Sequence, residues 1–267
     1  PDQWGVQRSA EAERFTAALV ALDLETGKVR WEFRTVHHDL WDRDLPSQPT
    51  LVDIEGSDGP VPAIIQPTKR GDLYVLDRRS GEPIVPVSEH PVPQGTVEGD
   101  FTAPTQPASA LSYAPQEPLR ERDMWGGTPF DQLACRIQFH RLRYEGDFTP
   151  PSEQGSLIYP GNVGVFNWPS VAVDPQRQLL FGAPNYLAFV SRLVKREEAQ
   201  DVRHGGGETG LQPNRGAPYM VSLTPFLSVL GLPCQAPPWG TVTAVDLRSM
   251  DTVSYTHLRA HETDSYL

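Results

Sequence analysis

The sequence predicts an all-β fold built from repeated units, and three observations support this prediction. Apolar, β-branched runs that end in Asp recur along the chain. Each run is followed by a polar turn and usually by a second apolar run. The 267 residues include 27 prolines, so proline has about twice its usual share of roughly 5%. Because proline removes a backbone donor and fixes φ, we expect many turns and few long helices.

Four segments share the pattern of strand, Asp, turn and strand. Asp suits such a turn because its side chain can hydrogen-bond nearby amides, and Gly suits it because Gly takes positive φ. Recurrence of this unit indicates an all-β repeat fold rather than a single sandwich. The four segments are 18–31, 73–81, 170–181 and 241–249.

The first of these segments contains a further motif, Ala21-x-Asp23-x-x-x-Gly27-x-x-x-Trp31. It resembles the tryptophan docking motif of quinoprotein propellers, in which a Trp packs between neighbouring blades. An ordinary hairpin with a buried Trp is the alternative interpretation of one copy. The three further partial copies favour a β-propeller in which insertions widen the spacing between units.

The predicted insertions are long and rich in proline. Residues 83–120 and 145–165 contain most of the irregular sequence, and such long loops are uncommon in compact domains. The stretch 195–218, with three consecutive glycines at 205–207, is interpreted as a mobile surface loop.

The end of the chain differs from the rest. A strand with an aromatic residue near the docking position is expected after Val253, but the strand pattern is lost there. Residues 254–267 resemble translated adapter sequence, and we interpret them as a non-native tail or, if native, as a frayed terminus. Residues 1–253 are interpreted as part of a propeller domain. The start without Met or a signal peptide indicates a segment of a larger protein.

Charge and composition restrict the partners of the protein. The net charge of −11 argues against nucleic acid, whose phosphates require Lys and Arg, and gives no basic patch for an anionic membrane surface.

The most apolar stretch, 221–234, is short and contains Pro225 and Pro233, so it is expected to be core or loop. The two cysteines, Cys135 and Cys234, can be buried thiols or one disulfide, and sequence alone leaves both open.

The most informative segment for function is Thr-Val-His-His-Asp-Leu-Trp-Asp-Arg-Asp-Leu-Pro at 35–46. Its charged residues would fall on every face of a helix, so we predict a loop that leaves a strand ending near Thr35. Polar groups concentrated on one loop of a rigid scaffold commonly form a site. The segment is therefore the first candidate for a functional site.

Three interpretations of this loop compete. The first is a metal site made by His37, Asp39 and a distant histidine, although His90, His140 and His204 all lie in weakly patterned loops. The second is a structural hydrogen-bond cluster that closes a blade. The third is a catalytic carboxylate.

A resemblance to a known family favours the third interpretation. The segment HHDLWDRDLPSQPTL at 37–51 is very similar to the matching segment of membrane-bound glucose and quinate dehydrogenases that use pyrroloquinoline quinone (PQQ). The resemblance covers nearly all of residues 1–253. It predicts an all-β fold that is part of an eight-bladed propeller with long Pro-rich loop insertions. Further matching motifs are DxWG at 2–5, TKxG at 68–71, VLDRR at 75–79, PVPQG at 91–95, DMWG at 123–126, FDQL at 130–133, RYEG at 143–146, FTPPSEQG at 148–155, PGN at 160–162 and GLPC at 231–234.

By this resemblance, Asp42 is the catalytic base and Lys69 contacts the cofactor. A carboxylate is needed to accept the hydroxyl proton as hydride leaves the substrate carbon. An ammonium can hydrogen-bond the quinone oxygens and stabilise the negative charge that develops there. Asp42 matches the family's catalytic position and Asp39 and Asp44 do not, and the alternative is that Asp42 only orders the loop. The two side chains are predicted to converge on one ring from separate strands.

One position departs from the family pattern. The family has an Asn-Pro pair after the strand near 171–181, and that Asn contacts the quinone. Here Ala183 and Pro184 align with the pair, and Asn185 follows two positions later. We predict that Asn185 takes over the contact; otherwise the contact is lost and the pocket differs. The role is not carried to Ala183.

The resemblance also implies an activity, cofactors and partners. The expected reaction is PQQ-dependent oxidation of a sugar or cyclic polyol, glucose first, with a Ca²⁺ or Mg²⁺ ion whose ligands lie upstream of Pro1. Electrons are expected to pass to ubiquinone, on the periplasmic side of the bacterial inner membrane, with the anchor in a missing N-terminal segment. A quinate or shikimate-type dehydrogenase and a non-catalytic propeller binding module are the alternatives. A piece that lacks blades is expected to be inactive alone.

Overall fold

A computed structural model describes residues 3–57, 59–199 and 209–257 of the chain. Antiparallel strands make up most of the regular structure, and helices are few. The elements are α1 Ala10–Phe15, β1 Ala18–Leu22, β2 Val29–Arg34, β3 Thr50–Gly56, β4 Gly59–Pro67, β5 Leu73–Asp77, β6 Val87–Pro91, β7 Thr105–Ser109, the 3-10 helix η1 Glu121–Asp123, α2 Pro129–Arg141, β8 Ser156–Ile158, β9 Val171–Asp174, β10 Leu179–Gly182, β11 Phe189–Lys195, β12 Gly210–Gln212, β13 Tyr219–Pro225, β14 Thr241–Asp246 and β15 Asp251–His257.

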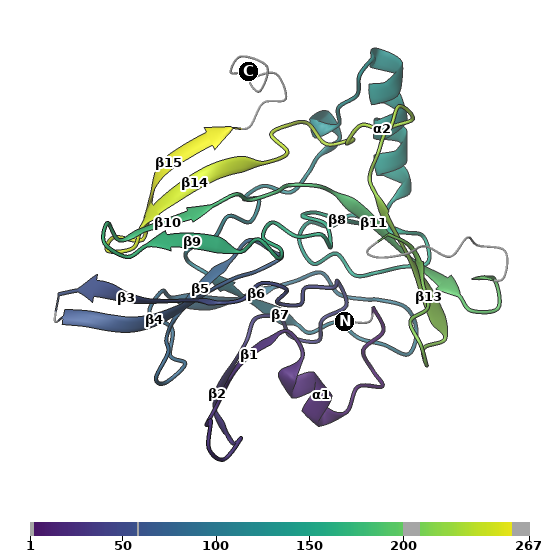
Figure 1. Cartoon of the computed structure of the whole chain (residues 1–267). Helices are drawn as coiled ribbons and strands as arrows, with labels where there is room; N and C mark the ends of the chain where they lie inside the picture. The colour runs from purple at the N-terminus through teal and green to yellow at the C-terminus, as the bar shows by residue number, and fades with distance from the viewer. Residues whose placement is uncertain (1–2, 58, 200–208, 258–267) are drawn as a thin grey trace.

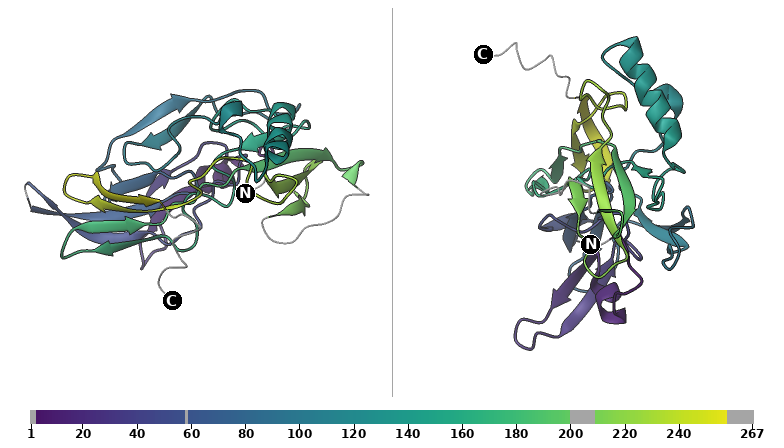
Figure 2. Two further views of the ribbon diagram at one scale, coloured as in Figure 1. Left: turned by 90° about the horizontal axis from the view of Figure 1, so that it is seen from above. Right: turned by 90° about the vertical axis from the view of Figure 1, so that its right-hand side faces the viewer.

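The strands form separate small sheets. The sheet orders are β1-β2, β3-β4-β5, β6-β7, β12-β13-β11-β8 and β15-β14-β10-β9. Figure 1 shows the β1-β2, β3-β4-β5 and β9-β10-β14-β15 sheets fanned out one above the other, and Figure 2 gives two further views. The prediction of an all-β repeat fold is confirmed.

The four predicted turns share one local structure. The Asp side chain accepts a backbone N–H from within the turn, at 2.9 Å from Thr26 to Asp23 and at 2.8 Å from Arg248 to Asp246. Asp77 and Asp174 accept equivalent bonds. The residue four positions after each Asp has a positive φ: +67° at Gly27, +78° at Gly81, +55° at Gln178 and +62° at Met250.

Trp31 joins two neighbouring repeats, as the docking motif predicts. Its Nε1 donates a hydrogen bond of 3.1 Å to the carbonyl of Arg78, in the turn after β5. A Cβ added at Gly81 would lie 2.8 Å from the indole ring, so only glycine permits this approach. The tryptophan of the first repeat therefore packs on the turn of the second.

The largest hydrophobic core lies between the β3-β4-β5 sheet and the β9-β10-β14-β15 sheet. Alternate residues of each strand point to the same face, which is the period expected of a strand. Leu180 of β10 and Val245 of β14 meet this face from the neighbouring sheet. The contributors from β3, β4 and β5 are Val52, Ile54, Ala63, Ile65, Leu73 and Val75.

The insertions contain more regular structure than predicted. Strands β6 and β7 pair within 83–120, and β8 lies within 145–165. Strand β12 lies within the predicted loop 195–218, of which 200–208 falls outside the described residues. No helix of the described ranges is long and apolar enough to cross a bilayer.

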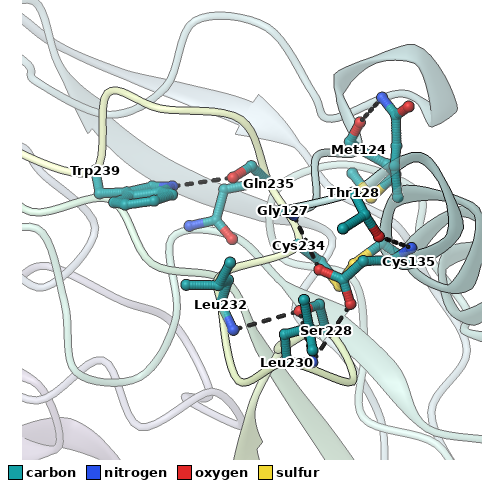
Figure 3. Close-up of a disulfide and its surroundings, with 12 residues drawn as sticks. Met124, Gly127, Thr128, Cys135, Ser228, Leu230, Leu232, Cys234, Gln235 and Trp239 are labelled. Carbon is teal, nitrogen blue, oxygen red and sulfur yellow. Dashed lines mark hydrogen bonds between the residues drawn. A yellow bond between two sulfur atoms is a disulfide. The ribbon is translucent and has the colours of Figure 1, made fainter.

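The longest described helix, α2, was not predicted. It begins after Thr128, whose Oγ1 accepts a hydrogen bond of 3.1 Å from the Asp131 amide, and Pro129 occupies its first turn. Cys135 of this helix forms a disulfide with Cys234, at a Cα–Cα distance of 5.4 Å, which settles the alternative left open by the sequence. Figure 3 shows the disulfide between α2 and the loop that carries Ser228 and Leu230.

The last strand continues beyond the predicted limit. Strand β15 pairs with β14 up to the partners Thr241 and His257, so residues 254–257 keep the strand pattern that the prediction ended at Val253. Ser254, eight residues after Asp246, occupies the position that Trp31 holds in the first repeat. Residues 258–267 of the predicted tail lie outside the described residues.

Candidate active site

The loop between β2 and β3 is organised by the Asp39 carboxylate. Its Oδ1 accepts a hydrogen bond of 2.9 Å from the Trp41 amide, and its Oδ2 accepts one of 2.8 Å from the Arg43 amide. Burial raises the pKa of Asp39 above its usual value. Both carboxylate oxygens of Asp39 accept hydrogen bonds from the backbone of its own loop. Asp39 therefore orders the loop, which is the role that the sequence left open as the alternative for Asp42.

Two large side chains anchor the same loop in the interior. Leu40 and Trp41 are fully buried in one hydrophobic cluster with Phe148. The Trp41 Nε1 donates a hydrogen bond of 2.7 Å to the Thr149 carbonyl, and its ring meets Phe148 edge-on at 5.0 Å. Asp42, which follows Trp41 with a φ of +61°, is thereby held at a fixed place.

The structure brings Asp42 and Lys69 together, as predicted. Lys69 follows β4, and its Nζ lies 3.1 Å from Asp42 Oδ2 and 2.7 Å from Asp44 Oδ1. The exposed fraction of the side chain is 3% for Lys69, 20% for Asp42 and 40% for Asp44. We call these three residues the Lys69 cluster. It is a nearly buried ammonium between two carboxylates that reach the surface.

The charges of the Lys69 cluster stabilise one another. Burial raises the pKa of Asp42 and the Lys69 ammonium is the largest of the influences that lower it; the net result is a pKa below its usual value. Burial lowers the pKa of Lys69, but Asp42 and Asp44 outweigh it and hold that pKa above its usual value. At neutral pH the carboxylate of Asp42 is therefore ionised and the amine of Lys69 is protonated.

The backbone of Lys69 is fixed by buried contacts from two other segments. The Arg43 guanidinium, which is fully buried, donates to the Lys69 carbonyl at 3.2 Å and to the Pro160 carbonyl at 2.7 Å. The Val165 amide donates to the Lys69 carbonyl at 2.7 Å. A Cβ added at Gly164 would lie 2.6 Å from Lys69 Cγ, so this loop packs directly on the lysine stem.

The third predicted residue, Asn185, lies near this arrangement and its side chain is exposed. Its amide donates a hydrogen bond of 3.0 Å to the Val165 carbonyl, and Val165 bonds to Lys69 in turn. The structure therefore places Asn185 two backbone hydrogen bonds from Lys69. Its contact with a quinone stays a prediction.

Comparison with known proteins identifies the family. A family model described as "PQQ: Glucose/ethanol/alcohol dehydrogenase, beta-propeller domain" matches residues 1–263. The chain belongs to this family. The predicted propeller class is thereby confirmed, and a solved quinohemoprotein alcohol dehydrogenase from Comamonas testosteroni has the same fold over 96% of this chain and 31% of its own, with a TM-score of 0.54 at 21% identity.

Curated relatives of this PQQ family chain are sugar and polyol dehydrogenases. It is 54% identical over 266 residues to a quinoprotein glucose dehydrogenase of Gluconobacter oxydans (95% of this chain, 33% of the relative). It is 51% identical over 259 residues to one of Escherichia coli (95% and 32%). A quinate/shikimate dehydrogenase (quinone) of Acinetobacter baylyi is 43% identical over 256 residues (93% and 32%). The chain spans about a third of the length of these relatives.

The two histidines of the loop between β2 and β3 pair with carboxylates other than Asp39. The His37 Nε2 lies 2.9 Å from Glu89 Oε1, and the His38 Nε2 lies 3.0 Å from Asp100 Oδ1. Over the ranges that the structure describes, no three His, Cys, Asp or Glu side chains are grouped to hold a metal ion. The contacts of His37 and Asp39 therefore do not support the metal interpretation, and His204, one of its candidate histidines, lies outside the described residues. The interpretation as a hydrogen-bond cluster fits them.

Two residues of the site were not found from the sequence. Asp44 was set aside in favour of Asp42, although it lies closer to the Lys69 ammonium, and Arg43 was given no role. The alternation Asp42-Arg43-Asp44 was an available signal, because alternate residues of an extended segment point to the same side. It would have indicated two carboxylates on one side and a buried guanidinium on the other.

Proposed function

We propose that the chain is part of a PQQ-dependent sugar dehydrogenase that oxidises glucose to gluconolactone. The observation that carries this proposal is the Lys69 cluster, which presents an ionised carboxylate and a protonated amine side by side. The identities of 54% and 51% to quinoprotein glucose dehydrogenases support glucose over quinate, for which the identity is 43%.

The chemistry of the Lys69 cluster fits a quinone. An ammonium has three N–H donors. That of Lys69 donates one hydrogen bond to Asp42 and pairs with Asp44 by charge, which leaves donor capacity for a quinone oxygen. PQQ, when bound, supplies the acceptor for two electrons and a proton. We propose that the exposed side chain of Asn185 provides a second contact to it.

In the proposed reaction Asp42 accepts the hydroxyl proton of the substrate. Its ionised state at neutral pH suits this role, and its partly exposed position allows a sugar to approach. Lys69 stays protonated and stabilises the negative charge that develops on the quinone oxygen. Asp39 and Arg43 hold both groups in place through the backbone.

Substitution of Asp42 tests this function. In the complete enzyme, loaded with PQQ and Ca²⁺ or Mg²⁺, we expect Asp42→Asn to lower kcat by about 10²- to 10⁴-fold, since this is the usual contribution of a general base. A PQQ titration followed by protein fluorescence controls for loss of cofactor. Activity within tenfold of the parent would remove Asp42 as the base.

A substrate series tests the specificity. Dye reduction with glucose, quinate, shikimate and glycerol should be fastest with glucose. Faster reduction with quinate would favour the quinate or shikimate-type alternative. No reduction with any substrate by the PQQ-loaded enzyme would favour the binding-module alternative.

We propose three further properties of the complete enzyme on the strength of the family resemblance. The metal is Ca²⁺ or Mg²⁺, ubiquinone accepts the electrons, and the enzyme faces the periplasm at the inner membrane through an anchor outside this chain. Removal of the metal with a chelator should abolish dye reduction, and addition of either ion should restore it. Reduction of ubiquinone by membrane fractions tests the acceptor.

A further inference from the structure

The Lys69 ammonium has a second carboxylate partner with no role in the proposed reaction. Asp44 Oδ1 lies 2.7 Å from Lys69 Nζ, closer than Asp42 Oδ2 at 3.1 Å. Asp44 is 40% exposed and keeps contact with water, whereas Lys69 is 3% exposed. The ammonium is therefore shared between an inner and an outer carboxylate.

Turnover creates a problem that a single carboxylate could not solve. When Asp42 accepts the substrate proton it becomes neutral, and Lys69 loses that counter-ion before hydride transfer has placed negative charge on the quinone oxygen. A buried ammonium without an anionic partner is costly and tends to lose its proton. The nearest other charges do not help, because Arg43 is a cation and Asp39 is bound to two backbone amides. Asp147 is paired with Arg70 at 2.5 Å.

We propose that Asp44 is a positioning residue that holds Lys69 protonated and in place while Asp42 is neutral. This proposal rests on the proposed function, since it assigns a duty within the same reaction. Asp44 itself contacts neither the hydroxyl proton nor the quinone in this scheme. It acts through Lys69 alone.

Competitive labelling of lysine amines tests the proposal without turnover. The chain contains three lysines, and the exposed Lys28 is an internal reference for Lys69. The complete enzyme without PQQ is treated with trace acetic anhydride at pH 8, and the Lys69/Lys28 labelling ratio is read by mass spectrometry. Acetic anhydride reacts with the neutral form of an amine, and each unit by which the pKa of Lys69 falls gives about tenfold more of this form. Loss of both carboxylate partners of Lys69 should therefore be visible as faster labelling of Lys69.

The variants have distinct expected outcomes. Asp42→Asn and Asp44→Asn should each keep the labelling ratio within about threefold of the parent, because one carboxylate remains. The double variant should raise the ratio by at least about tenfold over Asp42→Asn. A double variant that labels like Asp42→Asn would overturn the proposal.

Turnover gives the second measurement. We expect Asp44→Asn to lower kcat by at least about tenfold with KM within threefold. The reason is that Lys69 loses its last carboxylate partner only after Asp42 has been protonated, which happens after the substrate has bound. Asp44→Glu should recover kcat to within about threefold of the parent. The control is Asp53→Asn, which removes a 60% exposed carboxylate from a 2.9 Å ion pair with Arg78 and should leave kcat unchanged.

The two measurements separate the failure of each idea. Parental kcat in Asp44→Asn would overturn the proposal even if labelling shows the shared charge. If the parent enzyme oxidises no sugar or polyol, the proposed function fails, and the labelling ratio still decides whether Asp44 holds the charge of Lys69.

Discussion

Arg43 ties three segments of the chain together at one buried guanidinium. It joins the loop between β2 and β3 to the carbonyl of Lys69 and to that of Pro160, at 3.2 and 2.7 Å. Its charge is offset by Asp147, whose Oδ1 lies 3.8 Å away. The residue therefore positions Lys69 by holding its backbone, while Asp42 and Asp44 hold its side chain.

Replacing Arg43 with Met should destabilise the protein by about 2–4 kcal/mol, because the buried Pro160 carbonyl loses its donor and the Lys69 carbonyl loses one of its two donors. The measurement is the free energy of unfolding in denaturant. The control is Arg79→Met, which removes an exposed guanidinium paired with Asp77 and should cost far less than Arg43→Met. Equal losses in both variants would show that the buried contacts of Arg43 add nothing.

The lowered pKa of Asp42 determines where activity is lost in acid. Burial opposes ionisation and the Lys69 ammonium is the largest influence that favours it; the folded pKa lies below the ordinary value of about 4. The ionised base is therefore present at all pH values above about 4 and disappears only as the pH falls through the lowered pKa. We expect no loss of kcat/KM due to residue 42 above about pH 5. If kcat/KM instead falls at a pH above about 5, and the pH of that fall shifts in Asp42→Glu, the lowered pKa of Asp42 would be contradicted.

The residues that carry chemistry were only partly accessible from the sequence. Asp42 and Lys69 stand in motifs that resemble a known family, and the structure confirms that they meet. Asp44 and Arg43 were missed because their partners, Lys69 and Pro160, are distant in sequence. Only the fold determines which of several polar residues in a loop reaches such a partner.

At the scale of elements, the four Asp turns differ in how well their sequences suit their backbone. Gly27 and Gly81 supply glycine at the position of positive φ, whereas Gln178 and Met250 adopt it at +55° and +62°. A side chain in this left-handed region costs about 1–2 kcal/mol. Gln178 gains hydrogen bonds to the backbone of β3 in return, at 3.0 Å from the Glu55 amide and 3.1 Å to the Asp53 carbonyl.

Met250→Gly should stabilise the protein by about 0.5–1 kcal/mol. Glycine removes the strain of a side chain at positive φ, and the packing that is lost is that of an only partly buried side chain. The reverse change, Gly27→Ala, is a matched control. No atom lies within 4 Å of a Cβ at Gly27, so its loss of about 1 kcal/mol isolates the effect of φ. Both are read from denaturant midpoints, and destabilisation by Met250→Gly would show that the packing of Met250 dominates.

Trp31 should be worth more than its half-buried position suggests, because it links two repeats. We expect Trp31→Ala to cost about 2–4 kcal/mol, from lost packing on Gly81 and the lost hydrogen bond to Arg78. Trp168, which is 78% exposed, is the control, and Trp168→Ala should change the unfolding free energy by less than about 0.5 kcal/mol. A loss below 1 kcal/mol in Trp31→Ala would argue against docking between repeats.

The elements that the sequence revealed are those with a local signal. The repeats were found because the alternation of strands and the Asp turn are written in adjacent residues. Helix α2 was missed because its apolar residues are not confined to one buried face: Phe130, Leu133 and Ile137 are exposed, whereas Cys135 is buried. A cap at Thr128 and a disulfide at Cys135 hold it, and neither gives a periodic pattern.

At the scale of the whole molecule, several sheet faces remain uncovered. Leu22, Val29, Leu51, Phe181 and Val242 are exposed apolar residues on strands. Since the chain spans about a third of its curated relatives, we propose that residues 1–253 are one segment of a propeller domain and 254–267 a non-native tail. Recurrence of the Asp turn along the chain predicted blades. It did not reveal the β8-β11-β13-β12 sheet, because no turn that the structure describes between two of its strands is of the Asp type.

The isolated chain should therefore be inactive and weakly folded. Exposed sheet edges and apolar faces favour association over a single folded state. We expect no dye reduction after addition of PQQ and metal, and no single cooperative transition in calorimetry. A sharp reversible transition for the purified chain would contradict this expectation and would show that these sheets are stable by themselves.

The Cys135–Cys234 disulfide has a consequence for how the protein must mature. The two cysteines are 99 residues apart, so the bond closes a covalent ring that contains every strand from β8 to β13. Such a bond persists in oxidising surroundings and is rare where glutathione keeps thiols reduced. Material produced under reducing conditions would have an open ring, with α2 docked by non-covalent contacts alone, and would need oxidation to reach the architecture described above.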